Sequence, residues 1–148
     1  MDKSFKHKTP VQIRFKDMDS MGHVNNANYF AYVELARLRY FIEVAGPESD
    51  WGTQNGLILA RTEIDFRMPM FFGDNVTVYT RCSRIGNKSF DLKWLIVRTN
   101  TQPAVNAEEI VAEGLSVLAC YDYRRKVSIP VSAERKMQIE QFEGTKFS

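Results

Sequence analysis

The chain has 148 residues, 44% of them hydrophobic and 26% charged, which is the size and composition of one ordinary globular domain. We therefore predict a single domain over residues 1–148. The formal net charge of +2 is too small to indicate a nucleic-acid partner. No segment approaches the roughly 18 apolar residues of a membrane span, and the start MDKSFKHKTP lacks a secretory signal, so we predict a cytoplasmic protein.

Metal and disulfide chemistry find little support in the composition. The chain has only two cysteines, Cys82 and Cys120, and only two histidines. The cysteines lie far apart without a C-x-x-C motif, so they form neither a disulfide scaffold nor a zinc site. We expect both to be small buried apolar residues, and we predict neither a metal nor a separate cofactor.

A strand, a loop and a long helix are predicted in the first third of the chain. Residues 9–15 alternate Val11, Ile13 and Phe15 with polar residues, which is typical of a half-buried strand. Residues 16–26 form a polar loop. Residues 26–45 contain no Gly or Pro and place apolar side chains at helical spacing, which predicts a mostly enclosed helix. Asn25 or Asn26 would cap its start, and Gly46 would end it.

Strands dominate the rest of the chain. Alternating patterns predict strands at 57–67, 75–85, 88–99 and 109–123, and the Gly-Asn pair at 86–87 joins two of them as a hairpin. In the last strand we expect Val111, Leu115, Val117 and Ala119 to share a face. The tail 131–144 fits a short helix. This order predicts an α+β fold in which a curled antiparallel sheet wraps around one long central helix.

The loop before the long helix concentrates groups that can do chemistry. It places two carboxylates, one imidazole and two amides beside the helix N-terminus: Asp17, Asp19, His23, Asn25 and Asn26. A helix N-terminus offers unpaired N–H groups and a partial charge of roughly +0.5, which can stabilise the oxygen of a carbonyl under attack. A nearby carboxylate can attack that carbonyl or take a proton from water. Taken alone, such residues are more often helix caps and loop-ordering groups.

The segment FKDMDSMGHVNNANYFAYVELAR resembles the opening of the 4-hydroxybenzoyl-CoA thioesterase family of the hotdog-fold superfamily. Its D-x-D loop and H-V-N-N motif carry the likeness, and RMPMFFGDNVTVYTR is similar to the family's Pro-x-x-x-Gly-Asp turn and next strand. The resemblance spans about Thr9 to Tyr123. It implies a hotdog fold and hydrolysis of acyl-CoA or acyl-carrier-protein thioesters, without a cofactor beyond the coenzyme A of the substrate.

The resemblance assigns the catalytic carboxylate to Asp19, as general base or nucleophile, and a catalytic role to His23. One branch of the family carries Asn two residues after the catalytic Asp, where this chain has Met21. Another branch carries a catalytic histidine seven residues after it, where this chain has Asn26. A third branch uses a helix glutamate, and Glu34 is its counterpart here, although an ion pair with Arg37 is the plainer expectation.

The resemblance also implies a substrate site beside the helix. Backbone N–H groups at residues 26–28 would hold the oxyanion, and the predicted substrate-binding residues are Asn25, Asn26, Ala27, Asn28, Tyr29, Phe30 and Val33. Arg61, Arg67, Arg81 and Arg84 are candidates for coenzyme A phosphates, although solvated surface charges are their plainer interpretation. Hotdog proteins assemble edge to edge, so we expect a homodimer or homotetramer. Two alternatives stay open: a non-catalytic acyl-thioester binding protein, and a dehydratase acting on 3-hydroxyacyl thioesters.

Overall fold

The computed structural model describes residues 3–47, 55–99 and 107–147. Within these ranges, six strands form one antiparallel sheet in the order β1-β3-β4-β5-β2, with short β6 on β5. The strands are β1 (His7–Val11), β2 (Gly56–Phe66), β3 (Asn75–Ile85), β4 (Ser89–Thr99), β5 (Glu108–Asp122) and β6 (Val127–Ser128). The helices are η1 (Phe15–Asp17, a 3-10 turn), α1 (Asn26–Ala45) and α2 (Ala133–Glu143).

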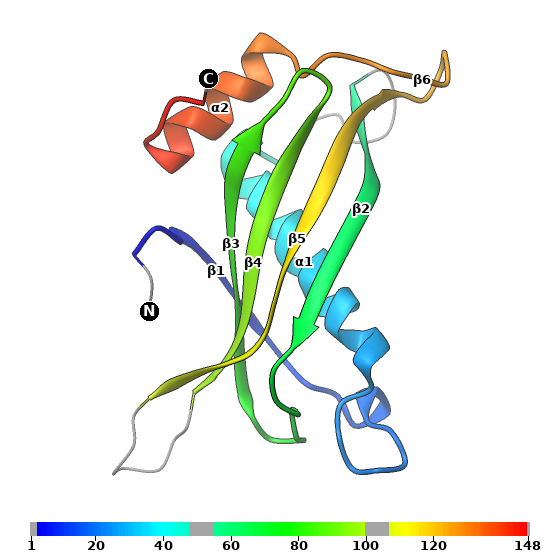
Figure 1. Ribbon diagram of the computed structural model, residues 1–148, viewed down its shortest axis with the longest axis vertical. Helices are drawn as coiled ribbons and strands as arrows, with labels where there is room; N and C mark the ends of the chain where they lie inside the picture. Colours follow the sequence, from blue (N-terminus) through cyan, green and yellow to red (C-terminus); the bar gives the residue numbers. More distant parts are fainter. Residues whose placement is uncertain (1–2, 48–54, 100–106, 148) are drawn as a thin grey trace.

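The sheet curls around α1, and α2 packs near the far end of that helix (Figure 1). This arrangement confirms the predicted α+β fold with a curled antiparallel sheet and one long helix. The core lies between the sheet and α1 in two clusters. One cluster includes Tyr29, Val33 and Trp94, and the other joins Tyr40 and Phe41 to Phe90 and to α2. None of the described helices is long and apolar enough to cross a bilayer.

The four residues predicted to share a face of β5 are not covered alike. Val111 is fully buried, whereas Leu115, Val117 and Ala119 are only partly covered and the alternate residues Ser116, Leu118 and Cys120 are buried. The reason is the indole of Trp94, which occupies the space in front of Gly114 and donates from its Nε1 to the Ser116 hydroxyl at 3.2 Å. Gly114 and Ser116 therefore leave room for Trp94 of β4 on the buried side of β5, and the alternation of apolar residues does not reveal this.

The first predicted strand is also shorter than its pattern. Strand β1 covers His7–Val11, and the chain then tightens into η1 because the Asp17 carboxylate accepts the backbone N–H of Arg14 at 3.0 Å. Val11 and Ile13 are buried as expected, but Phe15 stands 81% exposed. The predicted inward position of Phe15 is wrong, and its exposure becomes relevant below.

Helix α1 matches the predicted range, with Asn25 as its N-cap, but its enclosure is only partial. Phe30, Leu35, Leu38 and Ile42 are exposed on it. Among the described residues, Glu34 and Arg37 do not form the salt bridge that their spacing suggested. The strand β6 was not predicted, and most of the predicted loop at 100–108 lies outside the described residues.

Candidate active site

The loop between η1 and α1 closes on itself. The backbone N–H of Asp19 donates to the carbonyl of His23 at 2.7 Å, and the N–H of Gly22 donates to the carbonyl of Asp19 at 3.2 Å. Gly22 has φ 81°, in the left-handed region that glycine adopts without a Cβ penalty. Met18 and Val24 form a bridge at the base of the turn. The sequence therefore fixes Asp19 directly beside the start of α1.

One oxygen of the Asp19 carboxylate is held and the other is free. Oδ1 accepts the backbone N–H of Met21 at 2.9 Å and that of His23 at 3.2 Å. Among the described residues, Oδ2 has no hydrogen-bond partner, and the side chain is partly exposed. Two amide bonds thus orient the carboxylate and leave one oxygen for water or substrate. His23 positions Asp19 through its backbone N–H, and its ring forms no hydrogen bond with the described residues.

Asp17, two residues earlier, has the opposite surroundings. The residue is 2% exposed. Its Oδ2 accepts the Arg14 N–H and, at 2.8 Å, the Tyr32 hydroxyl, and the Arg14 guanidinium lies 3.4 Å from Oδ1. Burial alone would raise the pKa of Asp17, but the hydrogen bonds from Arg14 and Tyr32 and the charge of Arg14 outweigh it and hold the pKa below its usual value. Asp17 therefore orders the loop.

The first turn of α1 keeps one free donor. The side chain of Asn25 accepts the N–H of Ala27 at 2.9 Å, and its carbonyl accepts the N–H of Asn28 at 2.9 Å. The N–H of Asn26 has no acceptor among the described residues. Of the three backbone donors predicted at 26–28, two are therefore used within the protein. The Asn26 N–H is the group left for a developing oxyanion.

These groups surround a pocket of about 280 Å³. The pocket is lined by Asp19, Met21, His23, Val24, Asn25, Asn26, Tyr29 and Pro69. Burial raises the pKa of Tyr29, so its phenol stays protonated at neutral pH. The other predicted substrate-binding residues lie outside this lining: Ala27 is exposed, the Asn28 side chain donates to the Asp17 carbonyl, Phe30 is on the surface, and Val33 is in the core.

Two residues that shape the site were not predicted, and both lie in a second loop, residues 68–74, between β2 and β3. Val24 donates its N–H to the carbonyl of Met70 at 2.9 Å, which brings Pro69 from a loop 45 residues later into the wall. Phe71 of the same loop packs edge-on against the His23 ring, with centroids 5.2 Å apart. The Pro-x-x-x-Gly-Asp motif marks this second loop, but nothing in the sequence shows which of its residues reach the site.

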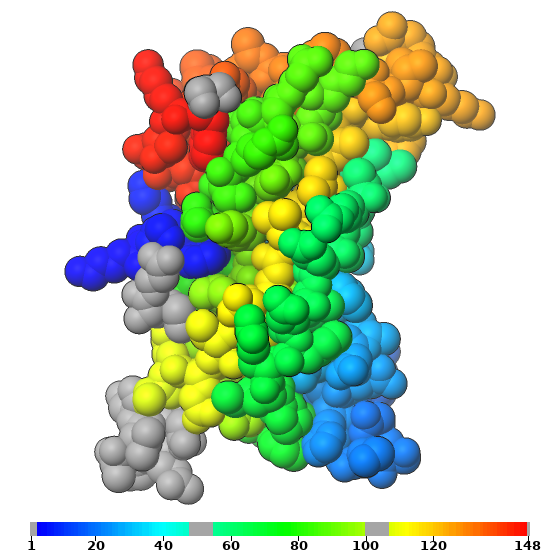
Figure 2. All heavy atoms as spheres, viewed as in Figure 1, coloured from blue at the N-terminus to red at the C-terminus, as the bar shows by residue number. Residues whose placement is uncertain are grey.

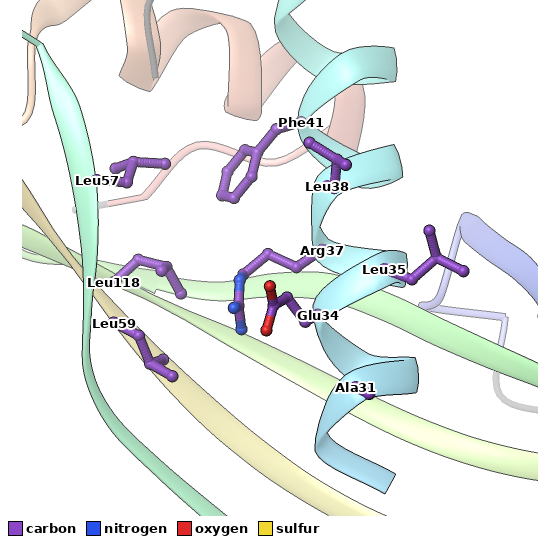
Figure 3. A pocket seen from close by; sticks show the side chains of 9 residues that line it. All are labelled: Ala31, Glu34, Leu35, Arg37, Leu38, Phe41, Leu57, Leu59 and Leu118. Carbon is purple, nitrogen blue, oxygen red and sulfur yellow. The ribbon is translucent and has the colours of Figure 1, made fainter. Parts of the chain in front are cut away.

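A larger groove, of about 510 Å³, lies between α1 and β2 (Figure 3). Leu57, Leu59 and Leu118 line it from the sheet, and Glu34 and Arg37 project into it from the helix. Glu34 therefore sits in a cavity different from the one that contains Asp19. The groove is mainly apolar, and Glu34 and Arg37 are the only ionisable side chains among its described lining residues.

The four candidate phosphate-binding arginines are tied to other groups. Arg61 pairs with Glu63 at 2.7 Å, Arg67 lies 3.4 Å from Glu113, Arg84 lies 3.7 Å from Asp91, and Arg81 stacks over the Phe5 ring. Within the part of the chain that the structure describes, no three His, Cys, Asp or Glu side chains gather as metal ligands.

A curled sheet around one helix, with a carboxylate held beside the N-terminus of that helix, defines a hotdog-fold protein of the thioesterase class. The chain belongs to the Thioesterase-like superfamily, whose family model matches residues 13–139. It is 31% identical to a thioesterase from Thermus thermophilus, solved with coenzyme A and Zn, over 97% of this chain and 98% of that one, with a TM-score of 0.80.

A further relative supports this assignment, and a further solved structure shares the fold. The chain is 24% identical over 136 residues to the long-chain acyl-CoA thioesterase FadM of Escherichia coli, covering 90% of this chain and 96% of that protein. A 4-hydroxybenzoyl CoA thioesterase, solved with 4-hydroxybenzoyl CoA, shares the fold at a TM-score of 0.78 and 20% identity, over 89% of this chain and 96% of that one. The predictions of the family, the fold class and a thioesterase are confirmed.

Proposed function

We propose that this protein hydrolyses acyl-CoA thioesters at the pocket beside the start of α1, with Asp19 as its catalytic carboxylate. The observation that carries the proposal is the asymmetry of that carboxylate. Oδ1 is fixed by two backbone N–H groups, whereas Oδ2 has no partner among the described residues and belongs to the pocket wall. A carboxylate that is oriented and still available is what a general base or nucleophile requires.

In the general-base form, Oδ2 of Asp19 takes a proton from water as the water oxygen bonds to the thioester carbon. The carbonyl oxygen then carries the negative charge and accepts the N–H of Asn26. The intermediate collapses by breaking the carbon–sulfur bond, and the thiolate recovers the proton from Asp19. In the nucleophilic form, Oδ2 itself bonds to the carbon, and the carbon–sulfur bond breaks with the sulfur leaving as thiolate. Water then hydrolyses the resulting anhydride, which releases the free acid, regenerates the Asp19 carboxylate and supplies the proton that the thiolate takes up. His23 lies in the same wall, where its imidazole can hydrogen-bond the water.

The names of the relatives support an acyl-CoA substrate. FadM is a long-chain acyl-CoA thioesterase, and the Thermus thioesterase was solved with coenzyme A. An acyl-carrier-protein substrate has the same thioester and remains the alternative at this site. Cytoplasmic location, which the relatives do not test, stays a prediction from the sequence.

The test is thiol release from a panel of aliphatic and aromatic acyl-CoAs by the wild type and by Asp19→Asn. The amide oxygen of Asn can still accept the Met21 and His23 N–H groups, so the turn is preserved while the base is removed. We expect the rate to fall by about a hundredfold or more. The matched control is Asp74→Asn, which changes another loop carboxylate that accepts a backbone N–H, from Phe71 at 2.9 Å.

Other outcomes favour the alternatives. Binding of acyl-CoA without thiol release would support a binding protein. Formation of an enoyl thioester would support a dehydratase. Unchanged turnover in Asp19→Asn would move the search to His23 and Glu34.

We also propose that the protein works as a dimer joined along β2. The outer edge of β2 pairs with no strand among the described residues, and Ile58, Leu59 and Phe66 are exposed on this strand. A long open strand with apolar side chains favours pairing with another copy. Tyr29 of the Asp19 pocket packs against Phe66 of this strand with ring centroids 5.1 Å apart, so a second copy on β2 would lie close to the pocket.

The charges in the groove of Figure 3 fit a two-fold axis. Glu34 and Arg37 project into the groove, and no salt bridge between them is described. Across a two-fold axis, Glu34 of one protomer can meet the partner's Arg37, and the reverse pair forms by symmetry. We expect Arg37→Glu to produce monomers, and the double swap Glu34→Arg with Arg37→Glu to restore dimers, in analytical ultracentrifugation. A monomeric wild type, or a swap that restores nothing, would contradict the dimer.

A further inference from the structure

A cluster of exposed apolar side chains lies at the end of the molecule that carries the Asp19 pocket. We call it the aromatic tip and define it as Phe15, Met21, Phe71 and Phe72. Phe15 is 81% exposed, Met21 76% and Phe72 60%. The tip combines two segments, residues 15–23 and 68–74, which adjoin at the lower end of the molecule in Figures 1 and 2. Exposed clusters of this kind mark interaction surfaces.

The side chains of the tip pack against one another, and the tip is continuous with the Asp19 pocket. The rings of Phe15 and Phe72 pack edge-on with centroids 6.2 Å apart, although they come from different loops. Asp74 fixes the second loop by accepting the Phe71 N–H, and Gly73 turns the chain with φ 94°. Met21 belongs both to the tip and to the pocket lining, and Phe71 packs on His23. The pocket therefore lies directly beside the tip.

Two exposed cations flank the tip, because Arg14 and Lys16 lie on either side of Phe15 in the sequence. Arg14 pairs with the buried Asp17, so Lys16 is the cation without an ion pair among the described residues, and the partly exposed Asp19 faces the pocket. The other two carboxylates nearby are engaged within the protein. Asp17 is buried under hydrogen bonds, and Asp74 bonds the Phe71 N–H and lies 3.6 Å from Arg98. Apolar side chains flanked by cations match the interface of an anionic bilayer, where the rings enter the acyl boundary and the cations meet the headgroups.

The size of the tip favours a bilayer over a protein partner. A stable protein interface takes roughly 20–30 residues on each side, whereas the tip consists of four side chains with two cations beside it. So small a group at the end of a molecule can enter a deformable lipid surface without a complementary cavity on the other side. A protein partner would need such a cavity to bury the protruding rings.

We propose that the aromatic tip docks this protein on an anionic lipid bilayer and opens the Asp19 pocket toward it. The docking stands without any catalysis; that the apolar acyl chain of an acyl-CoA enters the pocket from the bilayer rests on the proposed function. The transfer of Phe15 and Phe72 into the interface supplies the attraction, and Arg14 and Lys16 add a salt-dependent component.

The experiment is co-sedimentation with vesicles of phosphatidylcholine alone or with about a quarter phosphatidylglycerol. The wild type should bind the anionic vesicles, and Phe15→Ser with Phe72→Ser should lower the bound fraction by about tenfold or more. Lys16→Glu should weaken binding only to the anionic vesicles. Met137→Ser is the matched control, because Met137 is 52% exposed on α2 at the other end of the molecule. Hydrolysis of a short-chain acyl-CoA without vesicles should be equal in the wild type and in all three variants.

Three results would overturn the docking. The wild type could fail to bind either kind of vesicle, or the double variant could bind as well as the wild type. A lower oligomeric mass of the double variant in ultracentrifugation would assign the tip to a second copy instead. Failure of the proposed function is separate from all three, because it leaves Phe15-dependent vesicle binding in a protein that releases no thiol.

Discussion

The two ends of helix α1 use polar groups in different ways. At its start, Oδ2 of Asp19 and the N–H of Asn26 have no partner among the described residues. Near its other end, the Tyr40 hydroxyl donates to Oε2 of Glu143 at 2.6 Å, and the same oxygen accepts the Cys82 N–H at 2.8 Å. Tyr40 and Glu143 are both buried. The contrast separates groups that lock the fold from groups that remain available to a ligand.

The hydrogen bonds from Tyr40 and Cys82 to Glu143, which we call the lock, anchor α2 to α1 and to the sheet. Lys6 completes it by donating to the Glu143 carbonyl at 2.7 Å. Burial raises the pKa of Tyr40, with a further contribution from the Glu143 carboxylate, and burial raises the pKa of Cys82 to about 12. Tyr40 and Cys82 therefore stay protonated near neutral pH, which suits a structural role.

The largest effect on stability should come from Glu143→Ala. It leaves the Tyr40 hydroxyl and the Cys82 N–H buried without an acceptor, and we expect the free energy of unfolding to fall by about 2–4 kcal/mol. Turnover per folded molecule should hardly change, because the lock is remote from the pocket. Urea unfolding and active-site titration measure the two quantities. Glu134→Ala, an exposed position on the same helix, is the control and should change neither.

A smaller loss is expected at the other end from Asn25→Ala. Removal of the N-cap leaves the Ala27 N–H without its acceptor and should lower the free energy of unfolding by about 1 kcal/mol. Turnover should fall as well, because Asn25 lines the pocket and fixes the turn that presents the Asn26 N–H. Asn25→Asp retains a capping oxygen and should recover the stability. Equal stability of the Ala and Asp variants would show that the cap contributes nothing.

The mildest effect concerns pH and His7 of β1. His7 is buried against the rings of Tyr40 and Phe142, its Nε2 lies 3.1 Å from Glu43, and its Nδ1 has no partner among the described residues. Burial lowers its pKa, with Glu43 opposing this and Arg39 adding to it. Below pH 6.5 the unfolded chain protonates His7 more readily than the folded protein does. His7 therefore favours folding above pH 6.5, and this contribution to stability is lost as pH falls below that value.

His7→Gln should make the free energy of unfolding less dependent on pH between about 7 and 5, because no group at that position then titrates. Denaturant titrations at several pH values measure this slope. A slope identical to that of the wild type would show that His7 is not its source.

Most elements could be predicted because their patterns are long. The bounds of α1 and β3 match the prediction to the residue, since sustained periodicity and capping residues determine them locally. The two strands that differ from the prediction, β5 and β1, depend on contacts between distant residues or on a hydrogen bond within a loop. Trp94 packs against Gly114 and donates to Ser116 on the buried side of β5, and the bond from the Arg14 N–H to Asp17 ends the first strand early.

The candidate site was predictable in its polar part only. The loop motif brought out Asp19, His23, Asn25 and Asn26, and the structure places all four around one pocket. Pro69 and the Phe71 contact depend on how two loops meet, which spacing does not encode. Glu34 and Arg37 form no salt bridge among the described residues, and only the longer-range charge of Glu34 acts on Arg37, because spacing along a helix permits an ion pair without requiring one.

The most direct test of the account compares Asp17→Asn with Asp19→Asn in turnover and in free energy of unfolding. Asp19→Asn should lose about a hundredfold or more in turnover while its unfolding free energy stays within about 0.5 kcal/mol of the wild type. Asp17→Asn should lose about 1–3 kcal/mol of stability, because it disrupts a buried, hydrogen-bonded carboxylate. If Asp19→Asn keeps wild-type turnover, or loses it only by unfolding, Asp19 is a loop residue and the account is wrong.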